Sequence, residues 1–276
     1  MNNKFRCAPH LVLLLMLAMV FVADVFAKEV VVKVIKGNAT QEAQNTYFHQ
    51  LLTRALGAID TKQYVVEIVE FEYSQTRSLR LLNFEQSLDV SFTMTTPERE
   101  KEYIAIKHPL LKGMLGKRRF LVLKQNLDAF EKISISDLKA KVACQNIQWP
   151  DYQILKRNHF NVYGAPNYLT NYQMLSKGRC DYFPRGASEI EVNFEHMKAQ
   201  FPNLAIVKNR MLSYPAYIYF FVGKRNEQLA KDIEKGLNRL SKTGELAKLQ
   251  KAYLDKFYHQ DFLNNLNFRE FTLSID

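Results

Sequence analysis

The chain is poor in the residues that build fibrous, low-complexity or disulfide-dependent proteins. Its 276 residues include only 10 glycines, 8 prolines and 3 cysteines. These counts exclude collagen-like and low-complexity classes, and three cysteines are too few for a scaffold held by disulfides. With 47% apolar and 24% charged residues, the composition is that of a folded globular protein. The length allows one large domain or two smaller lobes.

Long hydrophobic runs are also missing. The longest, residues 11–22, is shorter than the about 20 residues of a membrane-spanning helix. It follows the basic Lys4 and Arg6, and Val25 and Ala27 then offer small residues for signal peptidase. The pattern predicts a secretory signal over residues 1–27, with export to the periplasm. An uncleaved amphipathic anchor is the alternative.

Motifs for common enzyme chemistry are absent from the sequence. It has no glycine-rich phosphate loop, no GxSxG elbow and no HExxH, and its histidines do not stand at metal-ligand spacing. We therefore expect no catalytic residue, no metal and no cofactor. The net charge of +10 favours an anionic ligand or surface, although a solvated basic surface explains it equally well. Export argues against a nucleic-acid partner.

Strand and helix patterns alternate along the chain. Strands are expected at 29–35, 64–71 and 89–94, with helices at 44–56 and 76–84 between them. The alternation is repeated between 119 and 222, where Ser136 is expected to cap a short helix, and two amphipathic helices follow at 228–240 and 244–257. Strands that alternate with helices predict mostly parallel sheets with crossover helices. Two such units without a flexible linker predict a two-lobed α/β protein.

The two cysteines outside the leader are expected to be free thiols. Cys144 is placed near the carboxyl end of one strand, and Cys180 at the amino end of another. If these strands are parallel, the two Cα atoms exceed the roughly 7 Å limit for a disulfide.

Three segments together resemble one protein family. The first is D-V-S-F-T-M-T-T-P-E-R at 89–99, followed by P-L-L-K-G at 109–113. The second is L-S-K-G-R-C-D at 175–181, and the third is Y-I-Y-F-F-V-G-K at 217–224 with the helix pair after it. Their order is similar to that of periplasmic solute-binding proteins of the amino-acid-binding type, extracellular solute-binding protein family 3.

The resemblance implies a type II periplasmic-binding fold with two crossing segments, near Leu111 and Tyr214. The first lobe would hold residues 28–111 and 213–276, and the second 112–212. It implies a non-enzymatic, monomeric protein that binds a small solute between the lobes for a membrane permease or a membrane sensor. Some exported relatives are cyclohexadienyl dehydratases, so an enzyme on this scaffold, with Glu189 as the nearby carboxyl group, is the alternative.

The same resemblance indicates which residues face the cleft. Arg99, after Thr95 and Thr96, matches the arginine that binds a ligand carboxylate, for which a planar guanidinium is well suited. Arg185 stands where relatives carry an aspartate for the ligand ammonium. A cation there would repel an ammonium group, so an anionic or carboxylate-bearing ligand without an amine is expected. Alternatively, Arg185 points outward and Glu189 supplies the acid.

Four further residues are candidate ligand contacts. Gln145 and Trp149, the only tryptophan, lie in the loop after a second-lobe strand, where Trp149 could cover the ligand or the core. Tyr47 and Arg77 begin the first two helices at the corresponding edge of the first sheet. Each could face the ligand, pack in the core or be solvated.

Overall fold

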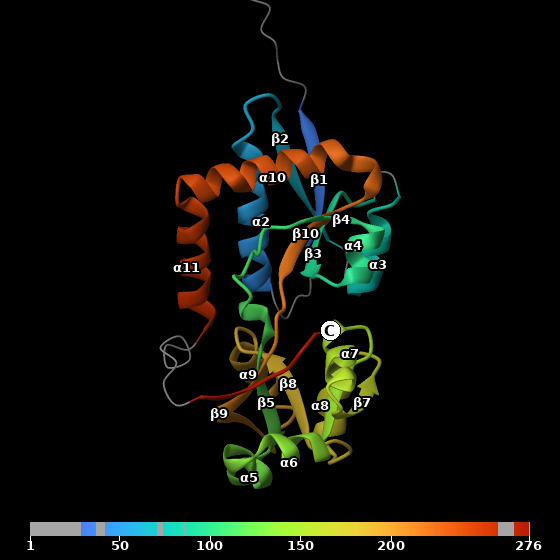
Figure 1. The fold of residues 1–276 in the computed structure, drawn as a ribbon, viewed down its shortest axis with the longest axis vertical. Helices are drawn as coiled ribbons and strands as arrows, with labels where there is room; N and C mark the ends of the chain where they lie inside the picture. The colour runs from blue at the N-terminus through green and yellow to red at the C-terminus, as the bar shows by residue number, and fades with distance from the viewer. Residues whose placement is uncertain (1–28, 37–41, 71–73, 85–86, 259–267, 276) are drawn as a thin grey trace, which may run out of the picture.

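The chain folds into two α/β lobes that follow one another along the long axis of the molecule (Figure 1). This computed structural model describes residues 29–36, 42–70, 74–84, 87–258 and 268–275. The secretory signal expected at residues 1–27 lies outside the described residues. Within them, no helix has both the length and the apolar character needed to cross a membrane.

The first lobe is built on a five-stranded mixed sheet. Across the sheet, its strands are β2 (Tyr64–Val69), β1 (Val30–Ile35), β3 (Val90–Met94), β10 (Ile218–Val222) and β4 (Ile104–Ile106). β1 is parallel to β2 and β3, whereas β10 is antiparallel to both of its neighbours. Because β10 comes from much later in the chain, it joins two distant segments into one lobe.

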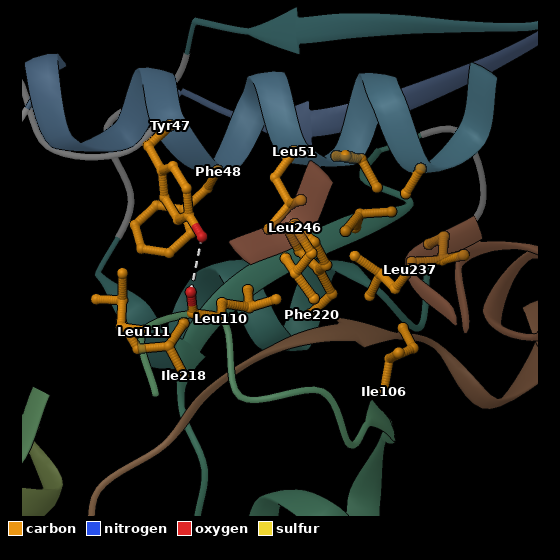
Figure 2. Packing of buried hydrophobic residues seen from close by; sticks show 14 of the residues in the cluster. Tyr47, Phe48, Leu51, Ile106, Leu110, Leu111, Ile218, Phe220, Leu237 and Leu246 are labelled. Carbon is orange, nitrogen blue, oxygen red and sulfur yellow. Dashed lines mark hydrogen bonds between the residues drawn. The ribbon is translucent and has the colours of Figure 1, made fainter. Parts of the chain in front are cut away.

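Helices cover both faces of this sheet. They are α2 (Glu42–Gly57), α3 (Gln75–Leu81), α4 (Pro97–Glu102), α10 (Glu227–Lys242) and α11 (Glu245–Phe257). Successive side chains of β10 point to opposite faces of the sheet and contribute to two hydrophobic cores. Phe220 packs with Leu51 and Leu237 beneath α2 and α10 (Figure 2), whereas Phe221 packs with Leu79 on the opposite face. The apolar, aromatic sequence of β10 follows from burial on both sides.

The second lobe contains a six-stranded sheet. Across the sheet, its strands are β11 (Arg269–Thr272), β9 (Leu204–Ser213), β5 (Lys117–Leu123), β8 (Tyr182–Gly186), β6 (Val142–Asn146) and β7 (Asn161–Ala165). Its α-helices are α5 (Leu127–Lys132), α6 (Ile135–Ala140), α7 (Pro150–Arg157), α8 (Tyr168–Ser176) and α9 (Ile190–Met197). Phe120 and Leu121 contribute to separate hydrophobic clusters, so this sheet is also covered on both faces.

Two segments that connect the lobes run side by side. One lies between β4 and β5, and the other between β9 and β10, and Tyr214 donates its backbone N–H to the carbonyl of Gly116 at 3.3 Å. A Cβ on Gly116 would stand 1.8 Å from the Tyr214 carbonyl oxygen. Glycine is therefore required for the two crossing backbones to approach so closely.

The C-terminal segment departs from the expected division of the chain. Residues 213–276 were all expected in the first lobe, but β11 pairs in parallel with β9 of the second sheet. Phe271 and Leu273 are buried in a second-lobe cluster, and the Ser274 carbonyl accepts from the Asn158 carboxamide at 2.7 Å. The chain therefore crosses between the lobes a third time after α11.

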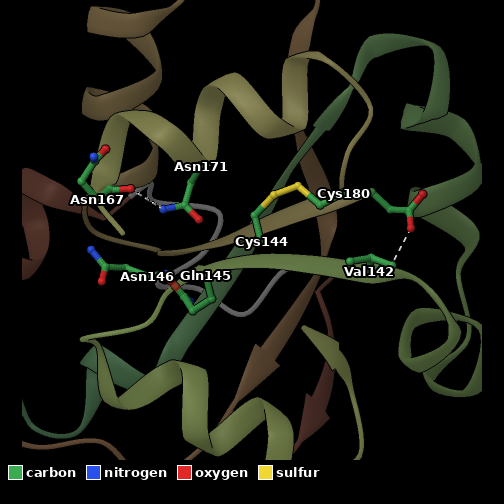
Figure 3. Close-up of a disulfide and its surroundings, with 8 residues drawn as sticks. Val142, Cys144, Gln145, Asn146, Asn167, Asn171 and Cys180 are labelled. Atoms are coloured by element: carbon green, nitrogen blue, oxygen red, sulfur yellow. Dashed lines mark hydrogen bonds between the residues drawn. A yellow bond between two sulfur atoms is a disulfide. The ribbon is translucent and has the colours of Figure 1, made fainter. Parts of the chain in front are cut away.

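Cys144 and Cys180 form a disulfide, so the expectation of free thiols is wrong (Figure 3). Their Cα atoms are 5.7 Å apart, within the range for a disulfide. β6 and β8 are indeed parallel neighbours. However, Cys180 lies in the turn before β8 rather than in the strand, so strand register does not fix its distance from Cys144.

Two local boundaries also differ from the sequence-based expectation. Ser134 rather than Ser136 caps α6, because its hydroxyl accepts from the Asp137 backbone N–H at 3.1 Å. β8 extends to Gly186, so Arg185 lies within a strand and not in the loop that follows.

Replacing Cys144 and Cys180 together by serine should lower the free energy of unfolding by about 2–4 kcal/mol, because the bridge restricts the unfolded chain. The bridge spans a sequence separation of 36 residues. Urea denaturation of the oxidised protein and the double variant would measure the difference. Alkylation of either cysteine in denatured, unreduced protein would contradict the bridge.

Candidate functional site

A cavity of about 140 Å³ lies between the two lobes. The first lobe contributes side chains from α2, the start of α3, β3, β10 and α11, and the second contributes from β5, β6, β8, the start of α7 and the turn before α9. The lining includes Gln44, Phe48, Gln75, Phe92, Thr93, Met94, Arg118, Gln145, Trp149, Asp151, Arg185, Ser188, Glu189, Ile218 and Tyr253. The volume is below the range for drug-sized ligands and fits a smaller solute.

The turn between β8 and α9 joins the lobes at one side of this cavity. The Gln44 carboxamide nitrogen, on α2, donates to the Ser188 carbonyl at 3.4 Å. Tyr253, on α11, lines the same cavity, and burial raises its pKa. Gln44 Oε1 is buried and has no protein partner in the described structure. The Gln44–Ser188 bond therefore links α2 of the first lobe to this turn of the second.

Arg118 is the centre of a buried ionic network in the second-lobe wall of the cavity. Its guanidinium pairs with Asp151 at 2.8 Å and with Glu189 at 3.4 Å, and its Nε donates to the Tyr214 hydroxyl at 2.9 Å. Tyr214 in turn donates to Asp151. Burial acts to lower the pKa of Arg118, but the charges of Asp151, Tyr214 and Glu189 raise it above its usual value. The arginine therefore remains charged while buried.

Arg185 lies in the cavity wall, but its charge is compensated. Its Nη2 donates to Glu189 Oε2 at 2.6 Å and to the Asn193 carboxamide oxygen at 2.7 Å. The expectation of an uncompensated cation at this position is therefore corrected, because the turn between β8 and α9 brings Glu189 back over the end of β8. The alternative that Arg185 points outward is also excluded by its 3% exposure.

Arg99 lies on the first-lobe side behind the cavity wall, is not itself one of the lining residues, and donates to neutral acceptors. Its guanidinium donates to the Thr93 hydroxyl (3.1 Å), the Met94 carbonyl (2.5 Å) and the Gln75 carboxamide oxygen (3.3 Å). All three acceptors belong to cavity-lining residues. Among the described residues, no carboxylate stands within ion-pair distance of it. Burial lowers the pKa of Arg99 to about 10, against the opposing attraction of Asp151 in the other lobe.

The remaining candidates divide between the cavity and other positions. Gln145 and Trp149 line the cavity. Tyr47 is buried and donates to the Leu110 carbonyl at 2.7 Å (Figure 2), and Arg77 lies in a separate surface hollow with Arg80. The two threonines are engaged locally and do not line the cavity: Thr95 donates to Glu100 at 2.7 Å, and Thr96 caps α4 by accepting from the Arg99 N–H at 3.2 Å.

Sequence reasoning missed Arg118, Asp151 and Gln44. Arg118 lies in the run Lys117-Arg118-Arg119, in which no pattern distinguishes the residue that faces the cavity. Asp151 occupies the first turn of α7, where an acidic residue is favourable at any helix and so carries no specific signal. Across the described ranges, no cluster of histidine, cysteine and acidic residues could hold a metal ion.

Comparisons with known proteins identify the fold. No family model and no curated protein matches the sequence. Among solved structures, a probable amino-acid ABC transporter extracellular-binding protein from Bacillus subtilis matches with a TM-score of 0.60 and 20% identity, covering 84% of this chain and all of that one. The chain has the fold of the extracellular solute-binding proteins.

Two other structures with this solute-binding fold are reconstructed ancestors. One is an ancestral arginine-binding protein bound to arginine, with a TM-score of 0.57, 18% identity, and coverage of 83% of this chain and 98% of that one. The other is an ancestral amino-acid-binding protein, a precursor of cyclohexadienyl dehydratase, with a TM-score of 0.55, 18% identity, and coverage of 83% and 95%. At such identities the likeness shows the fold alone.

Replacing Asp151 by alanine should lower the free energy of unfolding by about 3–5 kcal/mol, because it removes the nearest carboxylate from the buried Arg118. Asp255→Ala is the control, since it removes a solvent-exposed ion pair with Lys251 and should cost about 0–1 kcal/mol. Urea denaturation of both variants would measure the two values. Equal losses would show that the Arg118 network does not stabilise the fold.

Proposed function

We propose that the protein is a non-enzymatic solute-binding protein that holds a small carboxylate-bearing ligand between its two lobes. The observation that carries the proposal is the state of Arg99. It is half-buried behind the cavity wall without lining the cavity itself, its guanidinium donates to three neutral acceptors of that wall, and it has no carboxylate partner among the described residues. A ligand carboxylate would supply the missing charge.

The other charges around the cavity balance within the second lobe. Arg118 and Arg185 face Asp151 and Glu189 in mutual ion pairs. Each carboxylate therefore already has an arginine partner, which a ligand ammonium group would have to replace. Arg99, behind the first-lobe wall, has no carboxylate partner among the described residues, which favours a ligand with one negative charge over a cationic one.

The rest of the lining favours an organic ligand with an apolar part. Phe48, Phe92, Trp149, Ile218 and Tyr253 provide apolar and aromatic surface from both lobes. An apolar lining with a few oriented polar groups is typical of small-molecule sites. Closure of the two lobes around the ligand would bury this surface and bring Arg99 toward the second lobe.

The proposed setting is outside the cytoplasm, with delivery to a membrane permease or a membrane sensor by a monomeric protein. The buried Cys144–Cys180 disulfide supports this setting, because disulfides persist in oxidising compartments. The two-lobed solute-binding fold also supports it. Among the described lining residues, the two carboxyl groups, Asp151 and Glu189, accept hydrogen bonds from arginines, which favours a binding protein over the enzyme alternative.

Arg99→Ala should weaken binding of the carboxylate ligand by about 2–5 kcal/mol, because it removes a buried charge-assisted contact. A thermal-shift screen of aromatic acids, dicarboxylates and amino acids would identify the ligand, and calorimetry would then compare the proteins. Arg80→Ala, which removes an exposed arginine from the same lobe, is the matched control.

Unchanged affinity in Arg99→Ala, or tight binding of lysine by the unmodified protein, would contradict the proposal. Recovery of the ligand chemically unchanged after prolonged incubation is expected for a binding protein. Its conversion would establish the enzyme alternative instead.

A further inference from the structure

Arg185 is enclosed by aromatic rings from three segments of the second lobe. Its guanidinium carbon stands 4.9 Å from the ring centre of Trp149, 5.1 Å from that of Tyr168 and 5.2 Å from that of Phe183. These rings come from the residue before α7, from the first residue of α8 and from β8. All three distances lie within the roughly 6 Å over which an aromatic face attracts a cation.

Two polar side chains complete the enclosure. Glu189 and Asn193, from the start of α9, accept hydrogen bonds from Arg185 Nη2 at 2.6 and 2.7 Å. The Nε of Arg185 is buried and has no partner among the described residues. Aromatic faces, a carboxylate and an amide oxygen form a combination suited to a guanidinium or an alkylammonium group.

We propose that these five residues form a cation-binding subsite of the cleft, and that Arg185 is its built-in occupant. The residues are Trp149, Tyr168, Phe183, Glu189 and Asn193. Arg185 belongs to the cavity lining, so the subsite adjoins the space proposed for the solute. With Arg185 in place, the subsite is closed to the cationic group of any ligand. Its role in ligand selection rests on the proposed function, whereas the existence of the subsite does not.

Removal of the arginine side chain should open the subsite to a free cation. Arg185→Ala leaves the aromatic faces and the carboxylate in position, and methylguanidinium at millimolar concentration is the probe. Because Trp149 is the only tryptophan, its fluorescence reports directly on the subsite. We expect a saturable fluorescence change and a rise in Tm in Arg185→Ala, with neither in the unmodified protein.

Three controls separate cation binding from other effects. Sodium chloride at equal ionic strength and urea, a neutral planar analogue, should produce no saturable change. Arg185→Met fills the subsite with an apolar chain and should not respond to methylguanidinium. Adding Glu189→Gln to Arg185→Ala should weaken the response about tenfold or more, because a hydrogen bond to a charged carboxylate is lost.

The outcome is decisive even if Arg185→Ala folds poorly. Folding that requires methylguanidinium, and is lost when the cation is dialysed away, supports the subsite. If Arg185→Ala folds but shows no saturable response to methylguanidinium, the subsite proposal is wrong. It is also wrong if Arg185→Ala fails to fold with methylguanidinium present while Arg185→Met folds normally. In both cases Arg185 would be a structural residue only. None of these measurements uses the cleft ligand, so they fail or succeed independently of the proposed carboxylate binding.

Discussion

The arrangement of the cleft depends on the buried ion pair between Arg118 and Asp151. Arg118 comes from the first strand after one crossing segment, and Tyr214, which bonds both members of the pair, lies on the other. Glu189 adds the start of α9 to the same network. A buried guanidinium needs these partners, since an unpaired charge in the interior is costly. The network thereby fixes the second-lobe wall of the cavity relative to both crossings.

Electrostatic balance then distinguishes the two sides of the cavity. On the second-lobe side, two arginines and two carboxylates pair with one another, whereas on the first-lobe side Arg99 contacts neutral oxygen atoms. Arg185 illustrates why the charge of a single residue in the sequence does not predict the charge of the ligand. The same residue that suggests an anion site in the sequence is enclosed by aromatic rings and neutralised by Glu189. Arg99, which has no carboxylate partner among the described residues, therefore lies in the lobe that does not contain Arg185.

A disulfide and a hydrogen-bonded C-terminal strand both strengthen the second lobe. The Cys144–Cys180 disulfide connects β6 to the turn before β8, so it supports the strands that carry Gln145 and Arg185. On the opposite edge of the sheet, β11 pairs with β9, and Ser274 bonds Asn158 at the end of α7. The C-terminus thus secures the second lobe, although the helices that precede it belong to the first.

The sequence by itself determined the two-lobed α/β fold and most of its helices and strands. These follow from local hydrophobic periodicity and motif order, which are properties of neighbouring residues. The resemblance also indicated Trp149, Gln145 and Glu189, which line the cavity, although not their contacts. Only the tertiary structure decided the cysteine pairing, the placement of β11, the burial of Tyr47 and the roles of Arg118 and Arg185. Each depends on contacts between segments that are far apart in the sequence, and local sequence patterns do not show which of these segments are in contact.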